Sequence, residues 1–121
     1  LYSSPTGTGK SYMFLDALGS DPFGWGITNR VEIIAGMLEK CGEAGVKDWS
    51  INKLIDVAFE YRISTPVRFR NLLANGEMPF RPWRIYLDEA HHAIADTYAD
   101  IKAYLPGVSV AGLTATPYRG T

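Results

Sequence analysis

The residues with the clearest chemical potential form one short segment near the start of the sequence, SPTGTGKS over residues 4–11. Glycines in such a segment let the backbone approach a phosphate closely, and successive backbone N–H groups at a helix N-terminus favour an anion. The Lys10 ammonium would contact the β- and γ-oxygens of a nucleotide, and the Ser11 hydroxyl would complete the shell of a phosphate-bound Mg²⁺. The segment predicts a phosphate cradle of the P-loop type. Its predicted nucleotide contacts are Pro5, Thr6, Gly7, Thr8, Gly9, Lys10 and Ser11.

A second acidic site supports this interpretation. The strict cradle pattern G-x-x-x-x-G-K-[ST] begins with glycine, whereas this segment begins with Ser4, so a turn that only caps a helix is the alternative. Asp88 follows an apolar run directly, 78 residues after Lys10 (88 − 10), as expected of a carboxylate that holds Mg²⁺ through its water. Glu89 could then orient and deprotonate an attacking water. An acidic pair alone more commonly decorates a helix N-terminus, but together with the cradle it favours a catalytic role.

Composition limits the possible functions. The 121 residues suit one domain at most, and 46% hydrophobic with 21% charged residues is typical of a globular α/β core. The net charge of −1 provides no general basic field, so any contact with nucleic acid must be local. Cys41 is the single cysteine, which excludes a disulfide framework and a cysteine metal site and favours an intracellular, cytoplasmic location, with the nucleus not excluded. No apolar run approaches the roughly 18 residues of a membrane span, and no charged leader precedes one.

The positions of turn and capping residues predict alternating strands and helices. We expect residues 1–3 to end a strand, and a helix to run from Lys10 to a left-handed cap at Gly19. A buried strand over 25–28 precedes a helix capped by Thr28 or Asn29 and stopped by Gly42. Because the chain begins within an expected strand and without Met, we expect it to be a fragment.

The second half continues this alternation. Ser50 starts a helix, residues 61–64 form a short strand, and Thr65-Pro66 starts a helix that ends at Gly76 with Arg68 and Arg70 on its exposed side. Strands over 83–87 and 108–113 flank a helix centred on residues 98–105. The pattern predicts an α/β fold in three layers, a parallel sheet with right-handed crossovers and helices on both faces.

Each polar cluster follows an expected strand. Since ligands of open α/β sheets bind beyond the carboxyl ends of the strands, we expect these clusters to share one rim. They are residues 4–11, 28–30, Thr65, 88–92 and 114–116.

Three segments in order, SPTGTGKS, LDEAHH and GLTATPYR, resemble motifs I, II and III of the superfamily 2 helicases. The closest branch is the DEAH/DExH-like group, which includes excision-repair helicases and the translocating subunits of restriction enzymes. The resemblance implies that residues 1–121 are part of a first, RecA-like domain that binds ATP and Mg²⁺. It implies Lys10 and Ser11 for phosphate and Mg²⁺, Asp88 for Mg²⁺ and Glu89 for the water. His91 would couple the nucleotide to motif III, and Thr114 and Thr116 would link hydrolysis to movement.

Two weaker matches concern a nucleic-acid partner, which we expect to be DNA rather than RNA. Asn29 and Arg30 stand where motif Ia lies, and Thr65 and Arg68 where motif Ib lies. Exposed helix N-termini with a hydroxyl and a nearby arginine are anion sites. Ordinary helix capping with solvated arginines is an equal alternative.

The chain lacks two parts of the family pattern, the adenine-reading segment before the cradle and the second RecA-like domain with its arginine fingers. Other functions stay open. A metal hydrolase built on Glu89, His91 and His92 is a poor match because adjacent histidines point in different directions. A P-loop kinase leaves TATP and DEAHH without a role. A translocase without strand separation, or a nucleotide-binding fragment without hydrolysis, is the remaining alternative.

Overall fold

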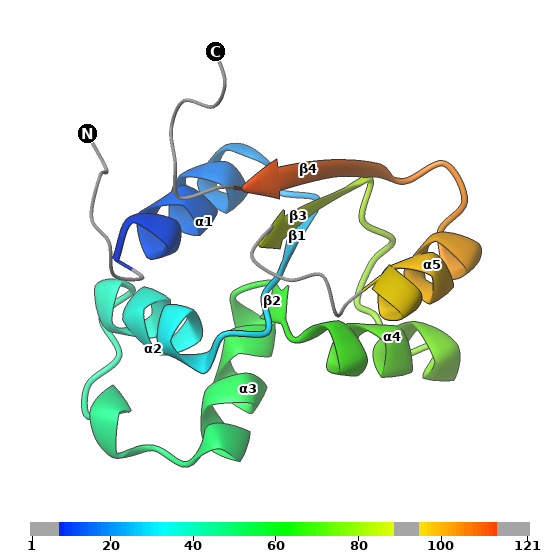
Figure 1. Cartoon of the computed structure of the whole chain (residues 1–121). Helices are drawn as coiled ribbons and strands as arrows, with labels where there is room; N and C mark the ends of the chain where they lie inside the picture. The colour runs from blue at the N-terminus through cyan, green and yellow to red at the C-terminus, as the bar shows by residue number, and fades with distance from the viewer. Residues whose placement is uncertain (1–7, 89–94, 114–121) are drawn as a thin grey trace.

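The computed structural model describes residues 8–88 and 95–113, with side chains for 11–88 and 99–113. Helices and strands alternate along this part of the chain (Figure 1). In chain order the elements are α1 (Thr8–Ser20), β1 (Gly24–Ile27), α2 (Val31–Lys40), the 3-10 turn η1 (Val46–Asp48), α3 (Ile51–Glu60), β2 (Ile63–Ser64), α4 (Pro66–Asn75), β3 (Arg84–Asp88), α5 (Ala95–Tyr104) and β4 (Ser109–Leu113).

The strands form one parallel sheet in the order β2-β1-β3-β4. Ile27 pairs with Leu87, and Asp88 at the end of β3 pairs with Leu113 at the end of β4. From β1 the chain passes to its neighbour β2 on one side, and from β2 it crosses back to β3 on the other side of β1. The strand order therefore switches direction between β1 and β3. Because parallel crossovers keep one hand, helices that lead in opposite directions lie on opposite faces.

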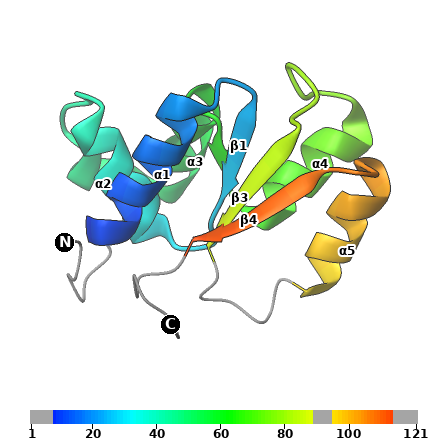
Figure 2. The same ribbon diagram turned by 90° about the horizontal axis from the view of Figure 1, so that it is seen from above.

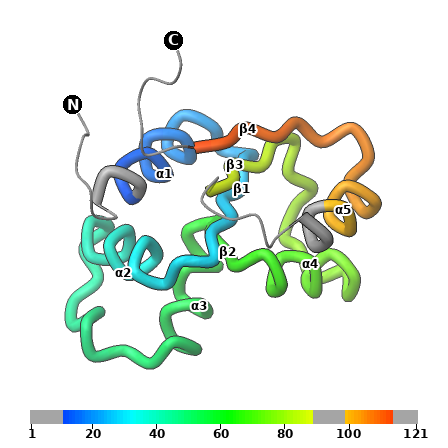
Figure 3. The backbone as a smooth tube through the Cα atoms, in the orientation of Figure 1, coloured from blue at the N-terminus to red at the C-terminus, as the bar shows by residue number. Residues whose placement is uncertain are grey.

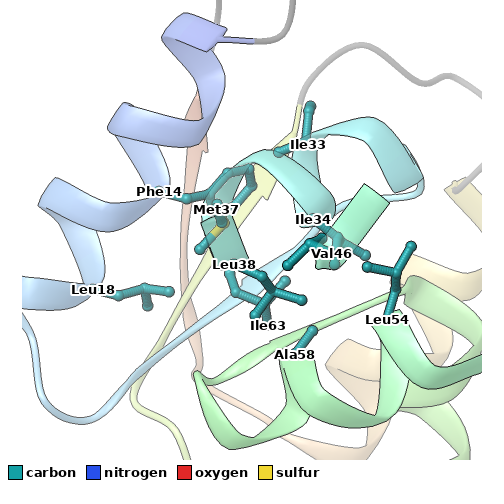
Figure 4. Close-up of a cluster of buried hydrophobic side chains, with 10 residues drawn as sticks. All are labelled: Phe14, Leu18, Ile33, Ile34, Met37, Leu38, Val46, Leu54, Ala58 and Ile63. Atoms are coloured by element: carbon teal, nitrogen blue, oxygen red, sulfur yellow. The ribbon is translucent and has the colours of Figure 1, made fainter. Parts of the chain in front are cut away.

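The helices cover both faces of the sheet, which confirms the three-layer prediction (Figure 2). One core packs α1, α2 and α3 against the sheet, with Phe14, Met37 and Ile63 buried in it (Figure 4). The other joins α4 and α5 to the opposite face around Trp25 and Phe69. Figure 3 shows α4 and α5 side by side, in agreement with their packing. Parallel strands buried on both sides explain the short apolar runs of the sequence.

Capping residues begin and end the helices largely as the sequence predicts. The Ser50 hydroxyl accepts a hydrogen bond from the backbone N–H of Lys53 and caps α3. Thr65 accepts one from the N–H of Arg68 at 3.3 Å and caps α4, whose first residue is Pro66. Gly76 adopts φ 70° after α4, a left-handed conformation that favours glycine.

Some local predictions are wrong. Gly19 does not provide a left-handed cap, because α1 continues through it to Ser20 and ends before Asp21. Neither Thr28 nor Asn29 caps α2, whose N-cap position is held by Arg30 without a side-chain cap bond. The strand expected over 61–64 is limited to the two residues of β2, because Arg62 has a positive φ of 65° that interrupts the extended backbone.

A polar network fastens the sheet at the amino ends of its strands. The Arg62 guanidinium donates to the carbonyl oxygens of Asp21 at 2.6 Å, Leu18 at 2.7 Å and Gly24 at 3.1 Å. The Asp21 carboxylate accepts from the Trp83 indole N–H and from the Tyr86 hydroxyl, 2.9 Å from its Oδ2. Although burial opposes ionisation of this carboxyl, these hydrogen bonds give it a lowered pKa.

Among the described helices, each is too short or too polar to cross a lipid bilayer.

Candidate nucleotide and nucleic-acid site

The carboxyl ends of β1 and β3 meet at one edge of the sheet, where Thr28 follows β1 and Asp88 ends β3. The Thr28 hydroxyl donates to Asp88 Oδ2 at 3.0 Å, and the backbone N–H of Thr28 donates to the Ser64 carbonyl at 3.1 Å. These contacts lie at the switch in strand order, the usual position of a ligand site in an open α/β sheet. At the expected rim, the structure therefore brings together Thr28 after β1, Ser64 at the end of β2 and Asp88 at the end of β3.

Asp88 is a buried acid at this edge, with 1% of its surface exposed. A buried carboxylate needs hydrogen bonds or positive charge to offset its lost hydration, and Thr28 supplies one such hydrogen bond. Carboxylate oxygens are ligands that Mg²⁺ prefers. The environment of Asp88 thus fits the metal-binding role that its position after an apolar strand predicts.

Ser11 lies in the first turns of α1 and is also 1% exposed. Its hydroxyl donates to the carbonyl oxygen of Ile33 in α2 at 3.3 Å. Gly36 lies against it, since a Cβ built at Gly36 would be 2.8 Å from Ser11 Oγ. A donated proton leaves the oxygen of a hydroxyl able to accept or to ligate a cation. The packing of α1 on α2 therefore holds this hydroxyl in place.

Thr28 is a residue at the candidate site whose expected role as a helix cap is wrong. A hydroxyl directly after a buried strand is typical of a helix cap. In the structure, the Thr28 oxygen instead accepts a hydrogen bond from the backbone N–H of Arg30 at 3.1 Å, and its O–H donates a hydrogen bond to Asp88. The signal that could have identified it is its place at a strand end, opposite another strand that ends in an acid.

The predicted nucleic-acid residues lie along the same rim, but their arginines are paired with acids. Arg30 Nε is 3.1 Å from Glu32 Oε2, and Arg68 Nη1 is 3.3 Å from Asp56 Oδ1. The pKa of Glu32 is lowered, first by a hydrogen bond from its own backbone N–H and then by Arg30, while burial and, to a smaller extent, the charge of Asp88 oppose this shift. Asn29 is exposed beside Arg30.

Arg68 and Arg70 are not among the buried residues of α4, as predicted, but each side chain is only partly exposed and is paired with an acid. The Arg68 guanidinium lies 5.8 Å from the Phe59 ring centre, and the Arg68 side chain is 36% exposed. Arg70 Nη1 lies 3.6 Å from Asp100 Oδ2, which ties α4 to α5. Neighbouring helices on either side of α4 supply these carboxylates.

A groove of about 510 Å³ runs between α3 and α4. The N-terminal turns of both helices contribute to it, and neither first turn carries an acid. A helix N-terminus attracts anions through its unpaired N–H groups. The residues that line the groove are Asn52, Ile55, Asp56, Thr65, Val67, Arg68, Asn71, Leu72 and Glu77.

Other predicted site residues lie outside the described part of the chain. They are Pro5, Thr6, Gly7, Glu89, His91, Thr114 and Thr116. For Thr8, Gly9 and Lys10 the structure describes the backbone, which forms the first turn of α1. The histidines of the metal-hydrolase alternative are also outside. Across the described ranges, no group of three histidine, cysteine, aspartate or glutamate side chains could hold a metal ion.

Comparison with family models matches residues 66–119 to the type III restriction enzyme res subunit. The matched part runs from α4 through β3, with Asp88, to β4 and beyond. Comparison with curated proteins and with solved structures gave no match. The second half of the chain is therefore similar to the res subunit of type III restriction enzymes, a helicase-like family of superfamily 2.

Proposed function

We propose that this chain is the ATP-binding and ATP-hydrolysing motor domain of a superfamily 2 DNA helicase or translocase, with hydrolysis coupled to movement on nucleic acid. The observation that carries the proposal is the hydrogen bond from Thr28 to Asp88 at 3.0 Å. This hydrogen bond connects the end of β1, which leads to Arg30, with Asp88, the acid expected to hold Mg²⁺. The ordered motifs and the similarity of residues 66–119 to the res subunit support the same function.

On the nucleotide side, the oxygen donors of Ser11 and Asp88 fit Mg²⁺. Both residues are 1% exposed, so their side chains are held by packing and hydrogen bonds before a ligand arrives. When bound, Mg²⁺ would neutralise negative charge that develops on the phosphates. Lys10 would bind the β- and γ-oxygens, and Glu89 would orient the attacking water and accept its proton. His91, Thr114 and Thr116 would pass the state of the nucleotide to the second domain.

On the nucleic-acid side, Asn29, Arg30, Thr65 and Arg68 would contact the phosphates of one strand. All follow the carboxyl ends of β1 and β2, the neighbouring strands of the sheet. Because neighbouring parallel strands end at the same edge of a sheet, these residues lie at one edge, where they could contact the phosphates of one strand. The similarity of residues 66–119 to a subunit of restriction enzymes favours DNA as the substrate. Two RecA-like domains that open and close would convert these contacts into translocation.

Lys10→Ala in the full-length protein tests the nucleotide site. Neutral backbone donors cannot fully balance the charge of the β- and γ-phosphates, so we expect loss of ATP·Mg²⁺ binding and of hydrolysis. ATPase assays with and without DNA measure this. Normal turnover by the variant contradicts the P-loop assignment.

Glu89→Gln separates binding from hydrolysis. The amide keeps the shape of the carboxylate but cannot accept a proton, so ATP should still bind while turnover stops. Asp88→Asn is the companion variant, in which the dependence of ATPase on Mg²⁺ concentration should change. If Glu89→Gln hydrolyses ATP normally, or if Asp88→Asn keeps the wild-type Mg²⁺ dependence, the roles proposed for this acidic pair are wrong.

The similarity to a restriction subunit also favours translocation without strand separation as a second candidate. The two functions differ in a simple experiment. A translocase displaces a third strand from duplex DNA and leaves the duplex paired, whereas a helicase releases a single strand. Both products can be resolved on one native gel with ATP present.

A further inference from the structure

Each arginine proposed to bind a phosphate is paired with a carboxylate. Glu32 in the first turn of α2 pairs with Arg30, and Asp56 in α3 pairs with Arg68, at 3.1 and 3.3 Å. The acids are more exposed than their partners, at 63% for Glu32 and 65% for Asp56 against 32% and 36% for the arginines. A guanidinium forms equivalent hydrogen bonds with a carboxylate and with a phosphate. Glu32 and Asp56 therefore occupy the guanidinium groups to which a phosphate would bind.

The groove between α3 and α4 surrounds the Arg68 pair and also contains the Glu77 carboxylate. Both helix N-termini line it, and Asp56 and Arg68 are among its residues. Arg68 Nε is buried and has no hydrogen-bond partner among the described residues, so Asp56 satisfies only part of this guanidinium. The guanidinium carbon also lies 5.8 Å from the centre of the Phe59 ring. A phosphate in the groove could bind the exposed part of this guanidinium, since the side chain is 36% exposed.

We propose that Glu32 and Asp56 are exchangeable counter-ions, which the phosphates of a bound strand displace from Arg30 and Arg68. This inference rests on the proposed function and adds its regulation, because the acids set how tightly a strand binds.

The energetics of surface ion pairs permit this exchange. Pairs at such exposure contribute little, so a phosphate need not overcome a large interaction. Each displaced carboxylate keeps a polar environment. Asp56 enters water, and Glu32 keeps the hydrogen bond from its own backbone N–H at the start of α2. The exchange thus leaves neither carboxylate buried without a partner.

The experiment measures binding of a fluorescently labelled oligo(dT) strand by full-length protein, using anisotropy over a salt series. Asp56→Asn and Glu32→Gln each remove a competing charge and keep the shape of the side chain. We expect each to raise affinity about two- to fivefold. Asp100→Asn is the matched control, because Asp100 pairs with Arg70 on the same helix but toward α5. It should change affinity far less.

A double-mutant cycle links the effect to the arginine. In an Arg68→Gln background, the gain from Asp56→Asn should disappear, since the guanidinium that Asp56 occupies is absent. Unchanged affinity in Asp56→Asn, an equal gain in Asp100→Asn, or a gain that persists without Arg68 overturns the exchange and leaves the motor function standing. If no variant binds the strand with or without ATP, the proposed nucleic-acid motor is itself wrong.

Discussion

Thr28 joins two strand ends through a single hydroxyl, which accepts from the N–H of Arg30 and donates to Asp88. Replacing it by valine keeps the shape and leaves the buried carboxylate without this donor. We expect Thr28→Val to lower the free energy of unfolding by about 1–3 kcal/mol and to shift the Mg²⁺ dependence of ATPase. Urea unfolding and a Mg²⁺ titration of the full-length protein measure the two effects.

Thr28→Ser is the control for this substitution. It keeps the hydroxyl and removes one buried methyl group, which costs about 0.8 kcal/mol. Its Mg²⁺ dependence should match that of the wild type. A Thr28→Val protein with unaltered Mg²⁺ dependence would show that the hydroxyl serves stability alone.

Tyr61 provides a pH-dependent contact at the end of α3. Its hydroxyl donates to Glu43 Oε2 at 2.7 Å, and this hydrogen bond, aided by burial, raises the pKa of Tyr61 to about 12. An unfolded tyrosine loses its proton near pH 10. The stabilisation is therefore fully present below about pH 10 and is lost as the pH rises toward 12.

We expect the difference in unfolding free energy between wild type and Tyr61→Phe to be constant at neutral pH and to shrink between pH 10 and 12. Taking the difference removes the titration of the other tyrosines and the lysines. Chemical unfolding at several pH values gives this quantity. A difference that stays flat across the alkaline range would mean that the Glu43 contact does not persist in solution.

Sequence patterns indicate sites that are built from near neighbours in the chain. They do not indicate contacts between residues that only the fold brings together. Ser11 and Asp88 can be proposed as site residues because a motif of neighbours surrounds each of them, and their roles stay predictions. The bond from Thr28 to Asp88 spans 60 residues and depends on the pairing of β1 with β3. The acids that pair with Arg68 and Arg70 come from helices on either side of α4, so no local pattern in the sequence indicates them.

At the scale of elements, helix ends were predictable wherever a cap acts within a few residues. Ser50, Thr65 and Gly76 mark ends of α3 and α4 as expected. The prediction at Gly19 failed because a glycine permits a left-handed turn without requiring one, and the helix stops only at the following Asp21-Pro22. The parallel sheet itself followed from the alternation of apolar strands with amphipathic helices, which allows few other arrangements.

The contact of α1 with α2 gives a test at this scale. Gly36→Ala would improve helix propensity by about 0.5–1 kcal/mol, but its Cβ would lie 2.8 Å from Ser11 Oγ. We expect stability to change little because these effects oppose each other. The affinity for ATP·Mg²⁺ should fall by roughly tenfold, the equivalent of a lost contact of about 1.4 kcal/mol.

Gly19→Ala separates propensity from the clash. Gly19 lies in α1 with no atom within 4 Å of a built Cβ, so the same substitution there should stabilise the protein and leave nucleotide binding unchanged. Nucleotide titration and thermal unfolding of both variants give the comparison. Equal affinity in the two variants would show that the Ser11 hydroxyl does not need its position against α2.

For the molecule as a whole, we expect residues 1–121 to bind nucleotide weakly and to hydrolyse it hardly at all when isolated. Phosphoryl transfer places charge on the equatorial oxygens, and an arginine from a second domain is worth about 10³–10⁵ in rate. Adding that domain, covalently or in trans, should restore an ATPase that responds to DNA. Brisk DNA-stimulated turnover by the isolated piece would contradict this expectation and place the arginine within it.

The hydrogen bonds donated by Arg62, here called the Arg62 clamp, lie at the amino ends of the strands, opposite the edge of the candidate nucleotide site. One guanidinium fixes the end of α1, the start of β1 and the start of β2 at the amino ends of the strands. Amides at that end should exchange with deuterium only when the whole domain unfolds, while those beside Thr28 can exchange through smaller openings. Nucleotide and DNA would therefore change deuterium uptake at one end of every strand, and the clamped end would serve as an internal reference in the same spectrum.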